Sequence, residues 1–167
     1  MTGGDMIETA SQFHPAAAGE GALMARAIER WQRVTLRGNR AYERSDRAGA
    51  LSHYRAALSL ADGLYGLGSA DPDQALAALV ISHHNLADLF EADGTPDSAA
   101  AHLCLAYEAL VHAIEDEALS QAWRDAAWRH ARIALEQLQR FLQRHPGHPR
   151  ATRSAAWSPL AVPAQPH

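Results

Sequence analysis

Residues 80–107 constrain the fold most, because they contain the pattern of a complete helical hairpin. Their sequence is VISHHNLADLFEADGTPDSAAAHLCLAY. Apolar residues recur every three or four positions on both sides of the polar segment 93–96, Asp-Gly-Thr-Pro. This period is typical of amphipathic helices, and Gly followed by Pro ends one helix and begins another. We therefore expect two antiparallel helices joined by a tight turn.

The same period continues through most of the chain and predicts an all-α fold of five helices. Asp46 and Asp71 precede two of them and are suited to cap their first turns. The expected helices cover residues 21–44, 46–65, 71–92, 96–116 and 117–144. The helical domain thus spans residues 21–144, between a flexible leader at 1–20 and a flexible, Pro-rich tail at 145–167. That tail contains five of the eight prolines and is not expected to be helical.

Charge and composition exclude several classes of function. The net charge of −4 gives no basic footprint for nucleic acid or an anionic membrane. No apolar run approaches the roughly 20 residues that span a bilayer. Cys104 is the only cysteine and cannot form an intrachain disulfide. All basic residues other than His are Arg, so lysine-based Schiff-base and P-loop chemistry is excluded. We expect a cytoplasmic protein that binds neither nucleic acid nor membrane.

Motifs for catalysis or metal binding are missing from the sequence. The ten histidines include no pair at i, i+4 and no H-E-x-x-H motif. Cys104 lies among apolar residues at helical spacing, where a thiol commonly packs in a core. We expect a protein that is not an enzyme, with no metal site and no cofactor.

The hairpin motif resembles the tetratricopeptide repeat family. Leu86, Ala87 and Phe90 fit the L-G-x2-Y part of its pattern, and Gly38 and Tyr54 occupy the glycine and aromatic positions of an earlier copy. The segment HNLADLF is most similar to the N-L-A-x-L-Y motif of the long-helix repeats in kinesin light chains. The resemblance covers residues 31–130. It implies antiparallel hairpins stacked as a short right-handed solenoid, closed by a long C-terminal capping helix.

The resemblance also implies a groove that binds a peptide or partner segment, as in an adaptor or chaperone. Asn39 and Asn85 would hydrogen-bond the peptide backbone, since an amide offers a donor and an acceptor. Trp128 would anchor an apolar side chain, and Arg124 and Arg132 would meet a carboxylate. The full expected set is Gln32, Thr35, Asn39, Tyr42, His84, Asn85, Asp88, Arg124, Trp128 and Arg132.

Several alternatives remain open at this stage. Asn39 and Asn85 could bond only neighbouring helices. The region of His83, His84 and His102 could bind a small ligand or metal. The groove could hold the protein's own tail, through residues 157–160. A homodimer could form through the second apolar stripe of the fifth helix, which contains Trp128, Leu135 and Leu142.

The first helix also carries a row of arginines at steps of three and four, all on one face. Its members are Arg26, Arg30, Arg33, Arg37, Arg40 and Arg44. A polar face of this kind is required at the end of a helical stack. The same row could dock an acidic partner or a second copy through bidentate Arg–carboxylate pairs.

Overall fold

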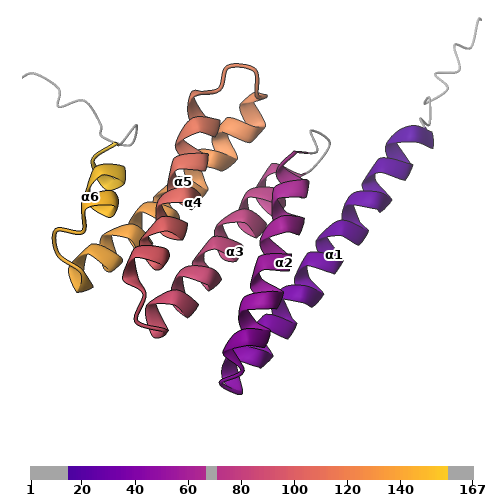
Figure 1. The fold of residues 1–167 in the computed structure, drawn as a ribbon. Helices are drawn as coiled ribbons and strands as arrows, with labels where there is room; N and C mark the ends of the chain where they lie inside the picture. Colours follow the sequence, from indigo (N-terminus) through magenta and orange to yellow (C-terminus); the bar gives the residue numbers. More distant parts are fainter. Residues whose placement is uncertain (1–14, 67–70, 158–167) are drawn as a thin grey trace, which may run out of the picture.

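The computed structural model describes residues 15–66 and 71–157, and this part of the chain forms six α-helices and no strand (Figure 1). The all-α prediction is confirmed. The helices are α1 (Pro15–Glu43), α2 (Arg47–Tyr65), α3 (Pro72–Ala92), α4 (Pro96–Glu115), α5 (Gln121–Arg144) and α6 (Pro149–Ala156). Within the described ranges, none of these helices has the length and apolar character that crossing a membrane demands.

Local sequence explains where the central helices begin. The Asp46 carboxylate accepts a hydrogen bond from the Gly49 amide at 2.9 Å and caps α2. Asp71 caps α3 in the same way through the amide of Gln74, at 3.2 Å. Between α3 and α4, Gly94 adopts a φ of +72°, which closes the predicted turn. The hairpin expected from residues 80–107 is therefore present.

The first helix is longer than the sequence pattern predicted. It begins at Pro15, so residues 15–20 are helical and the expected leader is wrong for that segment. Pro is favoured at the first helical position, and the alanines that follow have the highest helix propensity. The rest of the predicted leader, residues 1–14, lies outside the described residues.

The predicted tail contains a sixth helix, α6, so the expectation of a non-helical segment is wrong for residues 149–156. Its prolines delimit the helix, because Pro149 occupies the first helical position, where the missing N–H costs nothing. Gly147, at a φ of +75°, turns the chain between α5 and α6. Consequently α5 is not a terminal cap, since α6 folds back as its partner. Residues 158–167 lie outside the described part.

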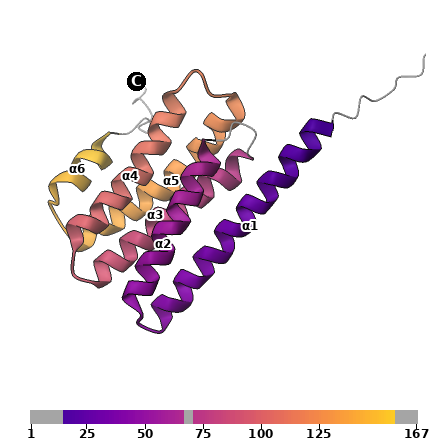
Figure 2. The ribbon, with the colours of Figure 1, turned by 45° about the vertical axis from the view of Figure 1, so that its right-hand side comes forward.

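The helices pack in sequence order, each against the next. In addition, α3 contacts both α1 and α5, and α6 contacts α4 as well as α5. Figure 1 shows the resulting row, with α1 at one edge and α6 at the other, and Figure 2 shows it after a turn of 45°. Small residues allow the close approach of neighbours. The buried alanines at these contacts include Ala57, Ala61, Ala99, Ala100, Ala126 and Ala127.

The contact between α1 and α2 depends on a glycine. A Cβ atom at Gly38 would lie 2.5 Å from Cε1 of Tyr54, closer than side chains can approach. Further along α1, the indole Nε1 of Trp31 donates a buried hydrogen bond to Ser82 Oγ of α3 at 2.9 Å. The first contact holds α1 against α2, and the second holds α1 against α3.

Candidate binding cleft between α1 and α3

Four residues expected to contact a peptide converge on one cleft of about 500 Å³. Asn39 and Tyr42 come from the last turns of α1, and Asn85 and Asp88 from the second half of α3. Each pair is three residues apart and therefore lies on one face of its helix. The remaining lining residues are Glu43, Tyr54, Glu91 and Ala92.

The wall contributed by α2 is the buried ring of Tyr54, whose hydroxyl donates to Asn39 Oδ1 at 3.0 Å. This bond fixes Asn39 with its amide nitrogen unused. Among the described residues, the Asn85 side chain forms no hydrogen bond at all. The cleft therefore presents one free amide donor from Asn39 and a complete free amide, donor and acceptor, from Asn85.

Three carboxylates give the cleft its charge, and one of them is already paired. Glu91 accepts two hydrogen bonds from the Arg144 guanidinium, at 2.7 and 2.9 Å. The Nε2 atom of His145 lies 2.9 Å from the same carboxylate. Hydrogen bonding by Arg144, and then by His145, lowers the pKa of Glu91. Glu91 is thus neutralised from α5.

Asp88 and Glu43 have no such partner among the described residues. Surrounding protein atoms raise the pKa of Asp88 by desolvation, and the charge of Glu91 raises it further, while Arg144 offsets part of the effect. Desolvation also raises the pKa of Tyr54, with smaller contributions from Tyr42, Asp88 and Glu43. Two of the three carboxylates in the cleft lining therefore lack an ion pair in the described structure.

Three expected residues on the same two helices lie outside the cleft lining. Gln32 is exposed. Thr35, one helical turn before Asn39 on the same face of α1, is buried, and its hydroxyl has no hydrogen-bond partner in the described structure. His84 is partly buried, its Nε2 is also without a partner there, and desolvation lowers its pKa to about 4.

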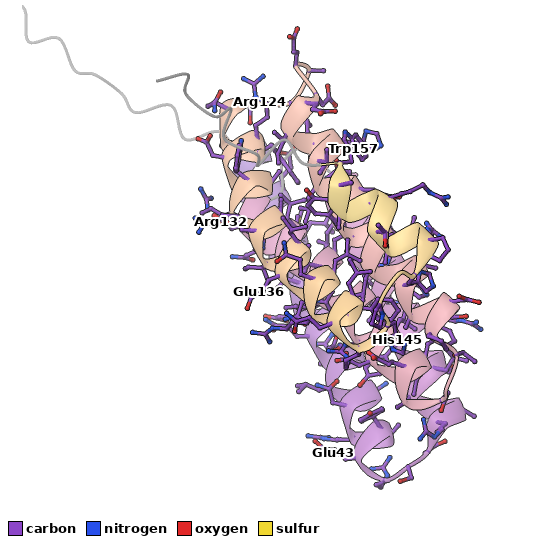
Figure 3. All side chains as sticks on the ribbon, turned by 90° about the vertical axis from the view of Figure 1, so that its left-hand side faces the viewer. Glu43, Arg124, Arg132, Glu136, His145 and Trp157 are labelled. Carbon is purple, nitrogen blue, oxygen red and sulfur yellow. The ribbon has the colours of Figure 1, made fainter. Side chains whose placement is uncertain are left out.

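The expected residues of α5 lie at the other end of the molecule. Trp128 and Arg132 border a separate hollow of about 510 Å³, together with Arg129, Ile133 and Glu136. Figure 3 shows Arg124 near the top of the molecule and Glu43 near its bottom, at opposite ends along the direction of the helices. The single groove expected to combine Asn39, Asn85 and Trp128 is therefore not formed.

The reason is an axial shift between α3 and α5. The expected groove requires Trp128 to lie near Asn85. Instead, Arg129 pairs with Asp73 at the start of α3, at 2.7 Å, and Arg144 pairs with Glu91 near its end. A motif on one helix specifies which face is buried, but it does not specify how far that helix slides along its neighbour.

The histidine region forms a pair rather than a cluster. His83 of α3 is buried, and its Nδ1 lies 3.0 Å from Nδ1 of His102 on α4. The ring of Phe90 stacks parallel to that of His102, with centroids 5.6 Å apart. In residues 15–66 and 71–157, no group of three or more His, Cys, Asp or Glu side chains is placed to hold a metal ion.

Sequence analysis missed three polar residues of the cleft, and helical spacing could have found two of them. Glu43 is four residues after Asn39, and Glu91 is three residues after Asp88, so each extends a face that was already identified. Tyr54 was recognised as a packing residue only. Its hydroxyl reaches the cleft because Gly38 lets the ring lie against α1.

These features define an all-α protein of consecutive helical hairpins with a polar cleft at one end of the row. The chain matches the family model described as a protein of unknown function, DUF2753, over residues 29–162. It belongs to this family. The matched region includes the cleft residues of both helices and the whole of α6. Neither the curated proteins nor the solved structures contain a match.

Proposed function

We propose that this protein is a non-catalytic, cytoplasmic interaction module, an adaptor or chaperone-like protein that holds a peptide segment of a protein partner in the α1–α3 cleft. The observation that carries the proposal is the convergence of Asn39, Tyr42, Asn85 and Asp88 on one cleft, with amide groups left unused.

The chemistry of the amides supports an extended peptide as the ligand. Each peptide unit has one N–H and one C=O, and a side-chain amide pairs with both without introducing a charge. Asn85 offers both groups, whereas Asn39 offers only its donor because Tyr54 occupies its oxygen. A cleft of about 500 Å³ accommodates a short segment with a few side chains.

The order of helix packing supports a short tetratricopeptide-like solenoid as the scaffold for this cleft. In such a stack, the first helix of each hairpin contacts the first helix of the next. Here α1 contacts α3, and α3 contacts α5. The α5–α6 hairpin would then be a third unit, with α6 shorter than the second helices of the other two.

Selection from a displayed library of random peptides tests the proposal. We expect wild-type protein to enrich a peptide family that the Asn39→Ala, Asn85→Ala double variant does not enrich. The matched control is Gln139→Ala, which removes an amide from an exposed position of α5. Circular dichroism and thermal unfolding confirm that each variant is folded. Enrichment of the same peptides by the double variant, or of none by the wild type, would contradict the proposal.

A further inference from the structure

We infer that the segment bound in the cleft is cationic, with an arginine or lysine side chain held between Glu43 and Asp88. This inference rests on the proposed function and specifies the chemistry of its partner. It comes from the distribution of charge, free hydrogen-bonding groups and aromatic surface around the cleft.

The cleft carries negative charge without a cation to balance it. Of its lining residues in the described structure, three are acidic and none is Arg, Lys or His. Arg144 neutralises Glu91 from outside the lining, and His145 forms a hydrogen bond with the same carboxylate. Glu43 and Asp88 form no ion pair with any described residue. Two carboxylates on opposite walls, one from α1 and one from α3, are thus available to a cation.

Several acidic residues elsewhere in the described structure do form ion pairs with cationic side chains. Asp73 is paired with Arg129 and His130, Asp93 with Arg47, and Glu136 with Arg140. In the described structure no Arg forms an ion pair with Glu43 or Asp88, although the charge of Arg144 acts on Asp88 from a greater distance. Desolvation and the charge of Glu91 raise the pKa of Asp88 more than the charge of Arg144 lowers it.

The neutral groups of the cleft also suit a cationic side chain on a peptide. Tyr42 is 40% exposed and offers a ring face, on which a guanidinium or ammonium is attracted by the π electrons. The free Asn85 oxygen accepts a hydrogen bond, and the Asn39 and Asn85 nitrogens donate to backbone carbonyls. A guanidinium makes full use of this arrangement, because its planar donors pair with carboxylates in bidentate geometry.

The size of the cleft favours a peptide over the arginine-rich face of a second copy. The arginine row of α1 belongs to a helix, which with its side chains is about 10 Å wide. A cleft of about 500 Å³ takes single side chains of an extended segment more readily than a whole helix. A second copy is nevertheless an outcome that the experiment distinguishes.

The experiment measures binding of three hexapeptides by isothermal titration calorimetry: alternating Ala-Arg, Ala-Gln and Ala-Glu, each with blocked ends. The test variant, Glu43→Gln with Asp88→Asn, removes two charges from the cleft. The matched control, Glu115→Gln with Glu117→Gln, removes two exposed, unpaired charges near the α4–α5 connection, at the other end of the molecule in Figure 1. The two variants have the same net charge, so non-specific attraction of the peptide is equal in both.

We expect wild type and control to bind the Arg peptide about tenfold more tightly than the test variant does, as for hydrogen bonds to charged groups. The preference for Arg over Gln should weaken between about 20 and 150 mM salt. Failure of the wild type to bind the Arg peptide, equal binding of the Gln or Glu peptide, or an equal loss in the control variant would overturn the inference.

Two further outcomes separate this inference from the function it rests on. If the Gln or Glu peptide binds and the Asn39→Ala, Asn85→Ala variant loses it, the interaction module stands and its cationic preference is wrong. If sedimentation velocity shows a dimer that the Glu43→Gln, Asp88→Asn variant converts to a monomer, the cleft holds a second copy, and the inferred peptide is wrong.

Discussion

The Nδ1 atoms of His83 and His102 face each other at 3.0 Å across the α3–α4 interface. At this distance one nitrogen donates and the other accepts, so the pair is satisfied only when at least one ring is neutral. The neighbouring charges disfavour protonation of the pair: Arg55 and Arg150 act on His102, and His84 acts on His83 once it is itself protonated. Desolvation, followed by the charges of His102 and His84, lowers the pKa of His83 from 6.5 to about 4.

This pair predicts that the protein loses stability in mild acid. The unfolded chain takes up a proton near pH 6.5, whereas folded His83 does so only near pH 4. Stability is therefore complete above pH 6.5 and falls as the pH drops toward 4, by roughly 3 kcal/mol for this residue. Urea unfolding at a series of pH values measures the loss.

The matched variant for this prediction is His83→Gln with His102→Gln, which keeps a neutral hydrogen-bonding pair. We expect a shallower loss between pH 6.5 and 4, with the remainder due to His84, whose pKa is also lowered to about 4 by burial. His53→Gln serves as a control at a histidine outside this pair. An unchanged slope in the double variant would locate the acid sensitivity elsewhere.

Substitution by alanine should have opposite effects on stability at Gly38 and at Gly63. Gly38→Ala should destabilise the protein by about 1–3 kcal/mol, because the new Cβ would collide with the Tyr54 ring. Gly63→Ala in α2 should stabilise it by up to about 1 kcal/mol, since nothing lies within 4 Å of a Cβ there. Thermal unfolding distinguishes the two, and similar effects at both positions would contradict the contact.

Displacement of the Tyr54 ring by Gly38→Ala should also change the position of Asn39 in the cleft. Moving the ring separates its hydroxyl from Asn39 and releases the amide to rotate. If the protein binds peptide as proposed, Gly38→Ala should weaken that binding at a temperature where the variant is still folded. Gly63→Ala should leave it unchanged.

The hydrogen bond between Trp31 and Ser82 predicts that removing a single hydroxyl group, that of Ser82, lowers the stability of the protein. Ser82→Ala leaves the buried indole N–H without its acceptor, which should destabilise the protein by about 1–3 kcal/mol. Ser52→Ala, at an exposed position of α2, should change stability by no more than about 0.5 kcal/mol. Chemical denaturation of both variants makes the comparison, and an equal effect at Ser82 and Ser52 would rule out a structural role for the bond.

Docking of α6 is testable through the buried thiol of Cys104. Ala151 of α6 is fully buried, so Ala151→Asp places an unpaired charge in the interface and should detach the helix. Cys104 should then react with a thiol reagent about tenfold faster or more, because the helix would no longer shield it. Thr152→Asp, on the exposed side of α6, should leave the rate unchanged. Equal rates in the two variants would show that α6 does not protect Cys104.

Helical periodicity predicted the central elements well because the information is local. Capping by Asp46 and Asp71, and the turn at Gly94, depend on residues within a few positions of one another. The same local reasoning failed at α6, where five prolines suggested an unfolded tail. Pro149 begins a helix there, and the burial of Ala151 and Ser154 against other helices stabilises it, a tertiary effect that the tail's composition conceals.

The residues of the cleft on α1 and α3 were predictable because their positions on a helical face also depend on local sequence. Asn39, Tyr42, Asn85 and Asp88 were identified because each pair shares a helical face, and their two helices are adjacent in the fold. Trp128 was misplaced because its position along α3 depends on long-range ion pairs such as Arg129–Asp73. No periodic pattern within α5 encodes that register.

The two ion-pair groups on α3 have a mechanical consequence. Asp73 holds Arg129 and His130 at one end, and Glu91 holds Arg144 and His145 at the other. Sliding α5 by a single turn would break both groups at once, so both oppose a change in the register between α3 and α5. The opposite side of the cleft, α1, touches α3 only sparsely and rests mainly on α2. The cleft thus has one wall, α3, that is braced by α5 near both ends, and a second wall, α1, that is supported mainly by α2.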